Sequence, residues 1–315
     1  MAMALEMQAS IQHRRRLGRW FARAPLATIG AAIILLLIVA AAAAPLLTHW
    51  NPTRATGGIN EFPSTTHLLG TTGQGQDVFS QFLYGGRISL AVGLTIAILT
   101  TLIALAVALT AAYFRGLVDD VLTLVTNVFL VIPSLPLMVL LAAFLPPGPV
   151  TIVFVLTLTG WAFGARLFRS QALSLREREF IAAADGGGES RWRVVFIELL
   201  PNMVSIVAAF FVNQVIFAVS AEASLEFLGL GNSGQVTWGT MLFWAQNSSA
   251  LLRGAWWTFV VPGMAIALTA FSLALINNAV DEISNPRLRA EQLMRQFGLR
   301  VRSASLMTPV QRHDR

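Results

Sequence analysis

The stretch "REREFIAAADGGGESRWRVVFIELLPN", residues 176–202, is charged and is interrupted by three consecutive glycines. It lies between two apolar runs, "TIVFVLTLTGWAFGARLF" (151–168) before it and "MVSIVAAFFVNQVIFAVSA" (203–221) after it. Each run has roughly the 18 to 20 residues that a helix needs to cross a bilayer. A polar segment between two such runs belongs in water, so the sequence predicts two membrane spans joined by a polar connection.

The composition of the whole chain supports a membrane protein. Charged residues make up 12% of the 315 residues and apolar residues 55%, whereas soluble domains carry roughly 25% charged residues. The chain has no cysteine and therefore no disulfide or thiolate metal site, and its four histidines show no metal-ligand spacing. All 22 basic residues are arginine. Without a lysine there is no P-loop, so any ATP would be hydrolysed on another chain.

Hydropathy predicts an all-α protein with six membrane-spanning helices. They are expected at residues 26–47, 88–113, 117–145, 149–168, 203–228 and 255–281. Pro133 and Pro136 are expected to kink the third span. The first span is interpreted as a retained anchor, because its polar leader and its apolar run are both longer than those of a signal peptide.

Arginine placement predicts the orientation. Arginines cluster before the first span, between spans four and five, and after the last span. The positive-inside rule then places both termini in the cytoplasm, and it attributes the net charge of +6 to these flanks rather than to nucleic acid binding. The chain divides into a cytoplasmic segment 1–25, a first span 26–47, an external segment 48–87, a membrane domain 88–285 and a cytoplasmic tail 286–315, in which the role of 291–315 stays open.

Two external features carry aromatic or apolar patterns. The segment "DVFSQFLYG" (77–85) has helical apolar spacing and is expected to be a short amphipathic helix at the outer interface. Trp238, Trp244, Trp256 and Trp257 are interpreted as an interfacial aromatic belt.

The connection between spans four and five, residues 176–201, is predicted to fold as a compact protruding knob. Residues 176–185 form a first helix, and Gly186–Gly188 break it. This glycine run is a helix breaker rather than a phosphate-binding nest, because neither a lysine nor a strand accompanies it. Ser190 caps a second helix that ends at Pro201, and its expected apolar face consists of Trp192, Val195, Phe196 and Leu199. Such a knob could dock into another protein.

The knob resembles the "EAA" cytoplasmic loop of bacterial ABC-importer permeases. Residues of the motif are matched by Ala183, Ala184, Gly188, Leu200 and Pro201. The chain departs from the motif twice: Ala182 replaces its glutamate, and Glu198 replaces a basic residue common before the Leu-Pro ending.

Four further stretches resemble the dipeptide, oligopeptide and nickel permeases, and the long external segment resembles that of their C-type subunit. These stretches are "HLLGTTGQGQDVFSQFLYGGRISLAVGL" (67–94), "AYFRGLVDDVLTLVTNVFLVIPSLPL" (112–137), "EASLEFLGLG" (222–231) followed by "WGTML" (238–242), and "NNAVDEISNPRLR" (277–289).

The resemblance implies the type I ABC-importer permease fold in the bacterial cytoplasmic membrane and the import of di- or oligopeptides. It implies a homologous permease subunit, two ATP-binding subunits and an external substrate-binding protein as partners. ATP and Mg²⁺ would belong to the ATPases, so this chain would have no cofactor and no catalytic residue. The residues implied to couple to the ATPases are Ala182, Ala183, Ala184, Asp185, Gly188, Arg191 and Trp192.

Two alternatives stay open. Within the family, the cargo could be nickel, glutathione or another small solute. A protein of another class, a stand-alone secondary transporter, would need ionisable residues in mid-span, and we expect the span cores to lack them.

Polar residues within the spans are the candidates for a translocation pathway. They are Asn127, Asn213, Gln214 and Glu222, although such groups also pair with neighbouring helices. Glu222 and Glu226 could also bind a cation, but facing the external vestibule or pairing with Arg87 or Arg253 is the favoured interpretation. The pair Asp119-Asp120 is expected in a solvated cytoplasmic turn.

Overall fold

The computed structural model describes residues 25–114, 116–179, 181, 187–190 and 193–284. The elements in these ranges are helices, and one isolated antiparallel bridge joins Thr71 to Asp77. In chain order the helices are α2 (Pro25–Ala42), α3 (Ala44–Leu47), α4 (Val78–Phe114), α5 (Gly116–Val131), α6 (Ser134–Phe144), α7 (Pro149–Arg176), the π-helix η1 (Val194–Leu199), α10 (Leu200–Phe227), α11 (Trp238–Asn247) and α12 (Trp257–Ser284).

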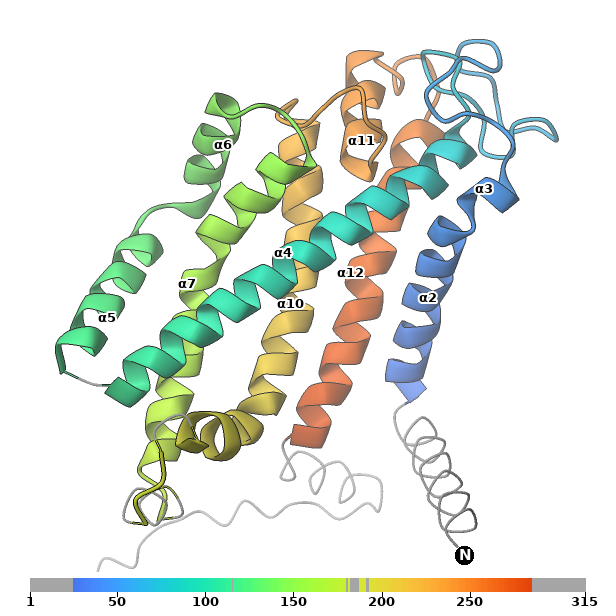
Figure 1. Ribbon diagram of the computed structural model, residues 1–315. Coiled ribbons are helices and arrows are strands. Elements are labelled where there is room, and N and C mark those ends of the chain that lie inside the picture. Colours follow the sequence, from blue (N-terminus) through green and yellow to red (C-terminus); the bar gives the residue numbers. More distant parts are fainter. Residues whose placement is uncertain (1–24, 115, 180, 182–186, 191–192, 285–315) are drawn as a thin grey trace, which may run out of the picture.

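The long helices form one bundle, and α4 crosses it diagonally (Figure 1). α4 contacts α2, α5, α7, α10, α11 and α12. Residues 48–77, called the lobe, lie with α11 at one end of the bundle, and the knob lies at the other end (Figure 1). These two ends are called the lobe end and the knob end.

Six spans are consistent with this bundle. Among the described residues five helices are long and apolar enough to cross a membrane, and α5 with α6 forms a sixth, broken span. α5 and α6 meet at an angle of 87°, and Pro133 is the N-cap of α6. The predicted kink is therefore confirmed at Pro133, where the ring removes a helix hydrogen bond.

The predicted division between an amphipathic helix at 77–85 and a span at 88–113 is wrong. α4 is one continuous helix of 37 residues. Its Gly85 and Gly86 do not break it, because they let another segment approach closely: a Cβ on Gly85 would lie 3.1 Å from the Thr237 carbonyl carbon, and one on Gly86 would lie 3.0 Å from the Trp238 ring.

Small residues bring α4, α7 and α10 together in the knob-end half of the bundle. Ala104 and Ala108 of α4 are fully buried there. A Cβ on Gly164 of α7 would lie 2.5 Å from Cζ of Phe210 and 2.9 Å from Cβ of Ala104. Spanning helices associate by such close packing, because lipid offers no hydrophobic drive between them.

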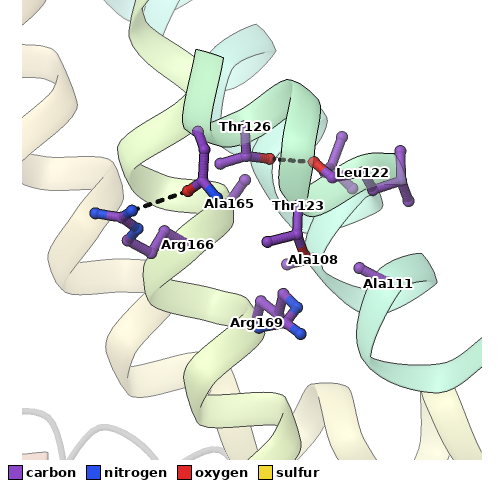
Figure 2. A pocket seen from close by; sticks show the side chains of 10 residues that line it. Ala108, Ala111, Leu122, Thr123, Thr126, Ala165, Arg166 and Arg169 are labelled. Atoms are coloured by element: carbon purple, nitrogen blue, oxygen red, sulfur yellow. Dashed lines mark hydrogen bonds between the residues drawn. The ribbon is translucent and has the colours of Figure 1, made fainter. Parts of the chain in front are cut away.

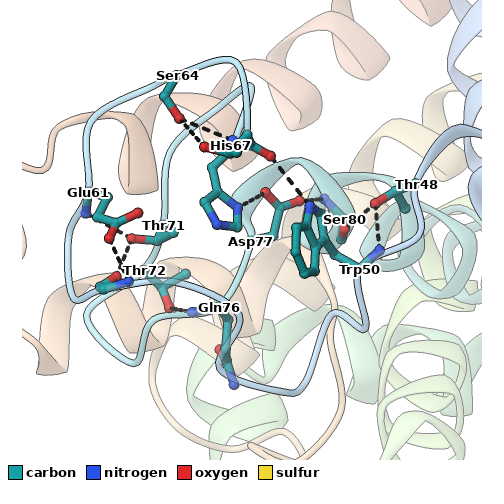
Figure 3. A network of polar contacts seen from close by, with 12 residues as sticks. Thr48, Trp50, Glu61, Ser64, His67, Thr71, Thr72, Gln76, Asp77 and Ser80 are labelled. Carbon is teal, nitrogen blue, oxygen red and sulfur yellow. Dashed lines mark hydrogen bonds and ion pairs between the residues drawn. The ribbon is translucent and has the colours of Figure 1, made fainter.

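The lobe is tied to α4 by a buried polar network (Figure 3). Nδ1 of His67 lies 2.8 Å from Oδ1 of Asp77, and both side chains are buried. The other oxygen of Asp77 accepts a 2.7 Å hydrogen bond from the Ser80 amide in the first turn of α4. The Ser80 hydroxyl in turn lies 2.6 Å from the hydroxyl of Thr48. The carboxylate of Asp77 therefore joins the lobe and satisfies a free N–H at the start of α4.

Two of the four tryptophans expected in an interfacial belt are buried instead. Trp238 and Trp257 are 1% and 2% exposed. Each donates its Nε1–H to a main-chain oxygen, Trp238 to Phe82 and Trp257 to Thr71, both at 3.1 Å. Buried tryptophans need such a partner, and these two fasten α11 and α12 to α4 and the lobe.

Candidate functional site

The knob begins where α7 ends, and this junction is fixed to the end of α4. Nη1 of Arg176 donates to the main-chain oxygens of Ala112 and Tyr113 at 2.8 and 2.7 Å. Beyond it, Gly188 has a φ of +74°, the left-handed region that favours glycine. A Cβ on Gly188 would have no neighbour within 4 Å in the described structure. Gly188 therefore has a backbone conformation that favours glycine, and no described residue lies close to the position of an added side chain.

Most of the predicted coupling residues lie outside the described part of the chain. These are Ala182, Ala183, Ala184, Asp185, Arg191 and Trp192. Their proposed contact with an ATPase stays a prediction.

The second half of the knob differs from the predicted helix. It is a π-helix, η1, in which the N–H of Leu200 reaches back five residues to the oxygen of Val195, and it runs into α10 without a break. Pro201 therefore does not end a helix; it occupies the first turn of α10. A π-turn before a proline is physically reasonable, because proline lacks an N–H and its ring clashes with the carbonyl four residues earlier.

The buried face of η1 is also shifted from the expected one. Val194, Val195 and Leu199 are 0%, 7% and 1% exposed, and they pack into the core shared by α4, α7 and α10. Phe196, expected on the apolar face, is 54% exposed, and its neighbour Ile197 is 53% exposed.

A polar pocket of about 230 Å³ lies between α4, α5 and α7 (Figure 2). Its lining residues are Val107, Ala108, Ala111, Leu122, Thr123, Thr126, Asn127, Ala165, Arg166 and Arg169. Arg166 and Arg169 lie one turn apart on α7 and face α5, the first half of the bent span (Figure 2). This is called the arginine pocket.

Two polar contacts join α5 and α7 at this pocket. Nε and Nη2 of Arg169 each donate at 2.6 Å to one carboxylate oxygen of Asp119, which is a bidentate ion pair. Nη2 of Arg166 donates at 2.9 Å to Oδ1 of Asn127. The interpretation of Asp119 as a solvated turn residue is wrong, because its side chain is only 16% exposed and its carboxylate pairs with Arg169. Paired charges of this kind lower the cost of an arginine in a membrane helix.

Comparison with known proteins decides the family. Residues 101–290 match the family described as "Binding-protein-dependent transport system inner membrane component", which is more than half of the chain. This chain belongs to that family. Residues 15–67 also match the N-terminal transmembrane domain of oligopeptide transport permease C.

Curated relatives of this permease cover most of it. A putative peptide transport system permease of Brucella suis is 32% identical over 84% of this chain and 88% of its own. The dipeptide transport system permease protein DppC of Bacillus subtilis is 33% identical over 72% of this chain and 71% of its own. The oligopeptide transport system permease protein OppC of the same organism is 30% identical over 85% and 88%, respectively.

A solved structure supports the fold of this permease. A chain of the MetNI methionine ABC transporter, solved in inward-facing conformations, superposes with a TM-score of 0.51 at 20% identity and covers 65% of this chain and 94% of that chain. The expected ABC-importer permease fold in a multi-pass protein of the cytoplasmic membrane is thus confirmed.

Within the described part of the chain, none of the three pockets found brings the four predicted pathway residues together. Only Asn127 lines the arginine pocket. Asn213 is exposed and its amide donates to the main chain of its own helix. Gln214 is buried against Gly160, whose added Cβ would lie 2.8 Å from the Gln214 amide nitrogen. Glu222 lies eight residues farther along α10, about 12 Å nearer the lobe end.

The buried glutamates of α10 pair with hydroxyls rather than with arginines. Glu222 accepts a 3.2 Å hydrogen bond from Ser89 of α4. Glu226 accepts from Thr237, the N-cap of α11. Arg87, one expected partner, instead donates to the main-chain oxygens of Ala41 and Ala42. Among the described residues the ion pairs do not include either glutamate.

Sequence reasoning missed Arg166. It lies in the last turn of the span predicted at 149–168, so the expectation that span cores lack ionisable residues stays a prediction. The sequence contains the matching spacings, one helical turn between Arg166 and Arg169 and two between Asp119 and Asn127, but only the fold shows that the two pairs face each other. No group of three or more histidine, aspartate or glutamate side chains suited to a metal occurs among the described residues.

Proposed function

We propose that this permease forms one half of the translocation pore of an ATP-driven importer that carries di- or oligopeptides into a bacterial cell. The observation that carries this proposal is its alignment, over most of its length, with permeases named for peptide, dipeptide and oligopeptide transport. The same names favour peptides over nickel or glutathione as cargo.

The proposal assigns the knob to the cytoplasmic side and the lobe to the outside, with both termini in the cytoplasm. Two ATPase subunits would contact the knob and hydrolyse ATP, while this chain itself holds no ATP, Mg²⁺ or catalytic residue. The exposed side chain of Ile197 and the open space around Gly188 leave room for such a partner to contact the knob. A homologous permease would supply the other half of the pore, and an external binding protein would deliver the cargo.

The arginine pocket supplies polar surface in a part of the bundle that is otherwise apolar. Arg169 is held by Asp119, whereas the exposed Arg166 makes one hydrogen bond, to Asn127, and retains further N–H donors. Arg166 is therefore the residue of this pocket that we assign to transient contact with a peptide carboxylate during passage.

Reconstituted uptake tests the proposal. The chain, co-expressed with its partner permease and ATPases and placed in liposomes with the binding protein, should accumulate radiolabelled peptide only when ATP is supplied. Uptake that follows an ion gradient and ignores ATP would instead identify a secondary transporter. The chain purified alone should hydrolyse no ATP.

Orientation has its own test, because the natural chain lacks cysteine. A single cysteine at Ser64 in the lobe should react in intact cells with a membrane-impermeant thiol reagent. One at Ser190 in the knob should react only after the cells are opened. The reverse pattern would invert the assigned topology.

A further inference from the structure

A second pocket, of about 140 Å³, lies at the lobe end and has a different chemistry from the arginine pocket. Three parts of the chain line this pocket. The lobe and the start of α4 contribute Thr53, Gln74, Gln76 and Gln81. The loop between α10 and α11 contributes Ser233, Gly234, Gln235 and Val236, and α11 contributes Thr240, Met241 and Trp244. A small adjoining space shares Gln74, Gln81, Met241 and Trp244 and extends the opening along α11 to Ser248. The two spaces together are called the glutamine groove.

Part of the groove wall is fixed in advance. The Gln81 side chain is buried and donates its amide to the Pro52 oxygen at 3.0 Å and to Oε1 of Gln76 at 2.7 Å. Gln76 donates to the oxygen of Thr53 at 3.0 Å. The indole N–H of Trp244 donates to the oxygen of Ser233 at 3.0 Å. These bonds hold the amides and the aromatic ring in place before any ligand arrives, which reduces the entropy lost on binding.

Two other amides are available to a ligand. Gln74 comes from the lobe and Gln235 from the loop between α10 and α11. Their side chains take part in none of the hydrogen bonds found in the described part of the chain, and both have solvent-accessible surface. Each amide offers two donors and one acceptor oxygen.

The lining contains no ionisable side chain. A charged group that entered would lose water without an opposite charge to replace it, which is costly. Neutral groups that both donate and accept hydrogen bonds match the lining, and the main-chain N–H and C=O of a peptide are such groups. The pocket is smaller than the roughly 300–1,000 Å³ of sites for drug-sized ligands. It therefore suits one or two peptide units of a longer, extended chain.

We infer that the glutamine groove binds a short, uncharged stretch of extended peptide main chain at the lobe end. Gln74 and Gln235 hydrogen-bond its peptide groups, and Trp244 packs against its side. This inference rests on the proposed peptide import and topology. Binding through the main chain would accept many peptide sequences, because every peptide shares those groups. The occupant is the cargo peptide, because the relatives of this permease are named for peptide transport and every peptide offers these main-chain groups.

Protection of a cysteine from modification tests this inference in the assembled transporter. Ser233→Cys changes one atom at the groove wall and serves as the reporter, and Gln246→Cys, on α11 but outside the lining, is the matched control. The probe is tetra-alanine that is acetylated at its N-terminus and amidated at its C-terminus. At about nine times its dissociation constant, it should slow thiol labelling of the reporter about tenfold by mass action and leave the control unchanged.

A second variant assigns the protection to the amides. Adding Gln235→Ala to the reporter should raise the peptide concentration needed for half-protection roughly five- to tenfold, the effect of losing one or two hydrogen bonds. An uncharged trisaccharide at equal concentration should give no protection; protection equal to that of the peptide would overturn the assignment to a peptide chain.

The remaining outcomes decide between the cargo peptide and other occupants of the groove. Protection by the free peptide supports the inference, whereas protection only by added binding protein would overturn it in favour of a loop of that protein. If neither protects while the same preparation imports peptide with ATP, the groove inference is wrong and the proposed function stands. If the preparation imports no peptide at all, the proposed function fails first.

Discussion

Replacing Gly188 separates two reasons why a glycine could be needed in the knob. The residue has a φ of +74°, and an added Cβ would meet nothing within 4 Å in this chain. If only the backbone conformation matters, Asn should be tolerated better than Ala, and Ala better than Val, because Asn adopts the left-handed region far more readily than β-branched residues. If a partner packs against Gly188, larger side chains should fail in order of size, and Asn should do as poorly as Val.

The expected loss of ATPase binding follows from the backbone conformation of Gly188 alone. A left-handed conformation costs an L-residue roughly 1–2 kcal/mol, and each 1.4 kcal/mol is a factor of ten in an equilibrium constant. Gly188→Ala should therefore weaken binding of the ATPases about five- to thirtyfold, with Val at or beyond the upper limit. The spans should fold normally, because Gly188 contacts none of them.

The assay is titration of the detergent-solubilised permease pair with its ATPases, together with peptide-stimulated ATP hydrolysis in liposomes. Gly148→Val is the matched control, since Gly148 is also in open space but has an extended backbone with φ of 163°. Unchanged binding by Gly188→Val would show that the knob does not couple to the ATPases. Equal loss with Asn and Val would refute the conformational argument in favour of steric contact.

Two further predictions concern packing and charge. Gly164→Val should overpack the junction of α4, α7 and α10 and cost roughly 1–3 kcal/mol, seen as a lower midpoint of thermal unfolding in detergent. Gly263 lies inside α12 with no neighbour within 4 Å of an added Cβ, so Gly263→Ala should not lower the midpoint and, by helix propensity, should raise it slightly. A midpoint of Gly164→Val at or above that of the parent would contradict the close approach. Asp119→Asn and Arg169→Gln should each lower the free energy of unfolding by roughly 1.5–3 kcal/mol. In a double-mutant cycle, the double variant should lose less stability than the sum of the two single variants. Strict additivity of the two losses would show that the ion pair does not stabilise the protein.

The sequence allowed the spans to be placed, because long apolar runs and proline have direct physical meaning in a membrane. The bend at Pro133 followed from the missing N–H of proline. The error at α4 arose because Gly85 and Gly86 resemble a turn in sequence, while their use here is to admit Trp238, a residue about 150 positions away. A local pattern does not contain that contact.

The candidate site was only partly predictable for the same reason. Asn127 was selected as a polar residue in a span, and it does line the arginine pocket. Arg166 was overlooked because its partner comes from another helix, and the hydroxyl partners of Glu222 and Glu226 also come from other elements. The glutamine groove combines three glutamines of residues 74–81 with Gln235, about 150 positions away, so it becomes visible only once the chain is folded.

The helix α4 has a mechanical consequence. Asp77 accepts a hydrogen bond from the first turn of α4 and also contacts His67 of the lobe. At the other end, Arg176, where the knob begins, donates hydrogen bonds to the last turn of α4. Its 37 residues contain no proline and span about 55 Å. A tilt of about 5° about its knob end would swing the lobe by about 5 Å. Under the proposed topology, a push on the knob end of α4 would therefore move the lobe end through one continuous helix.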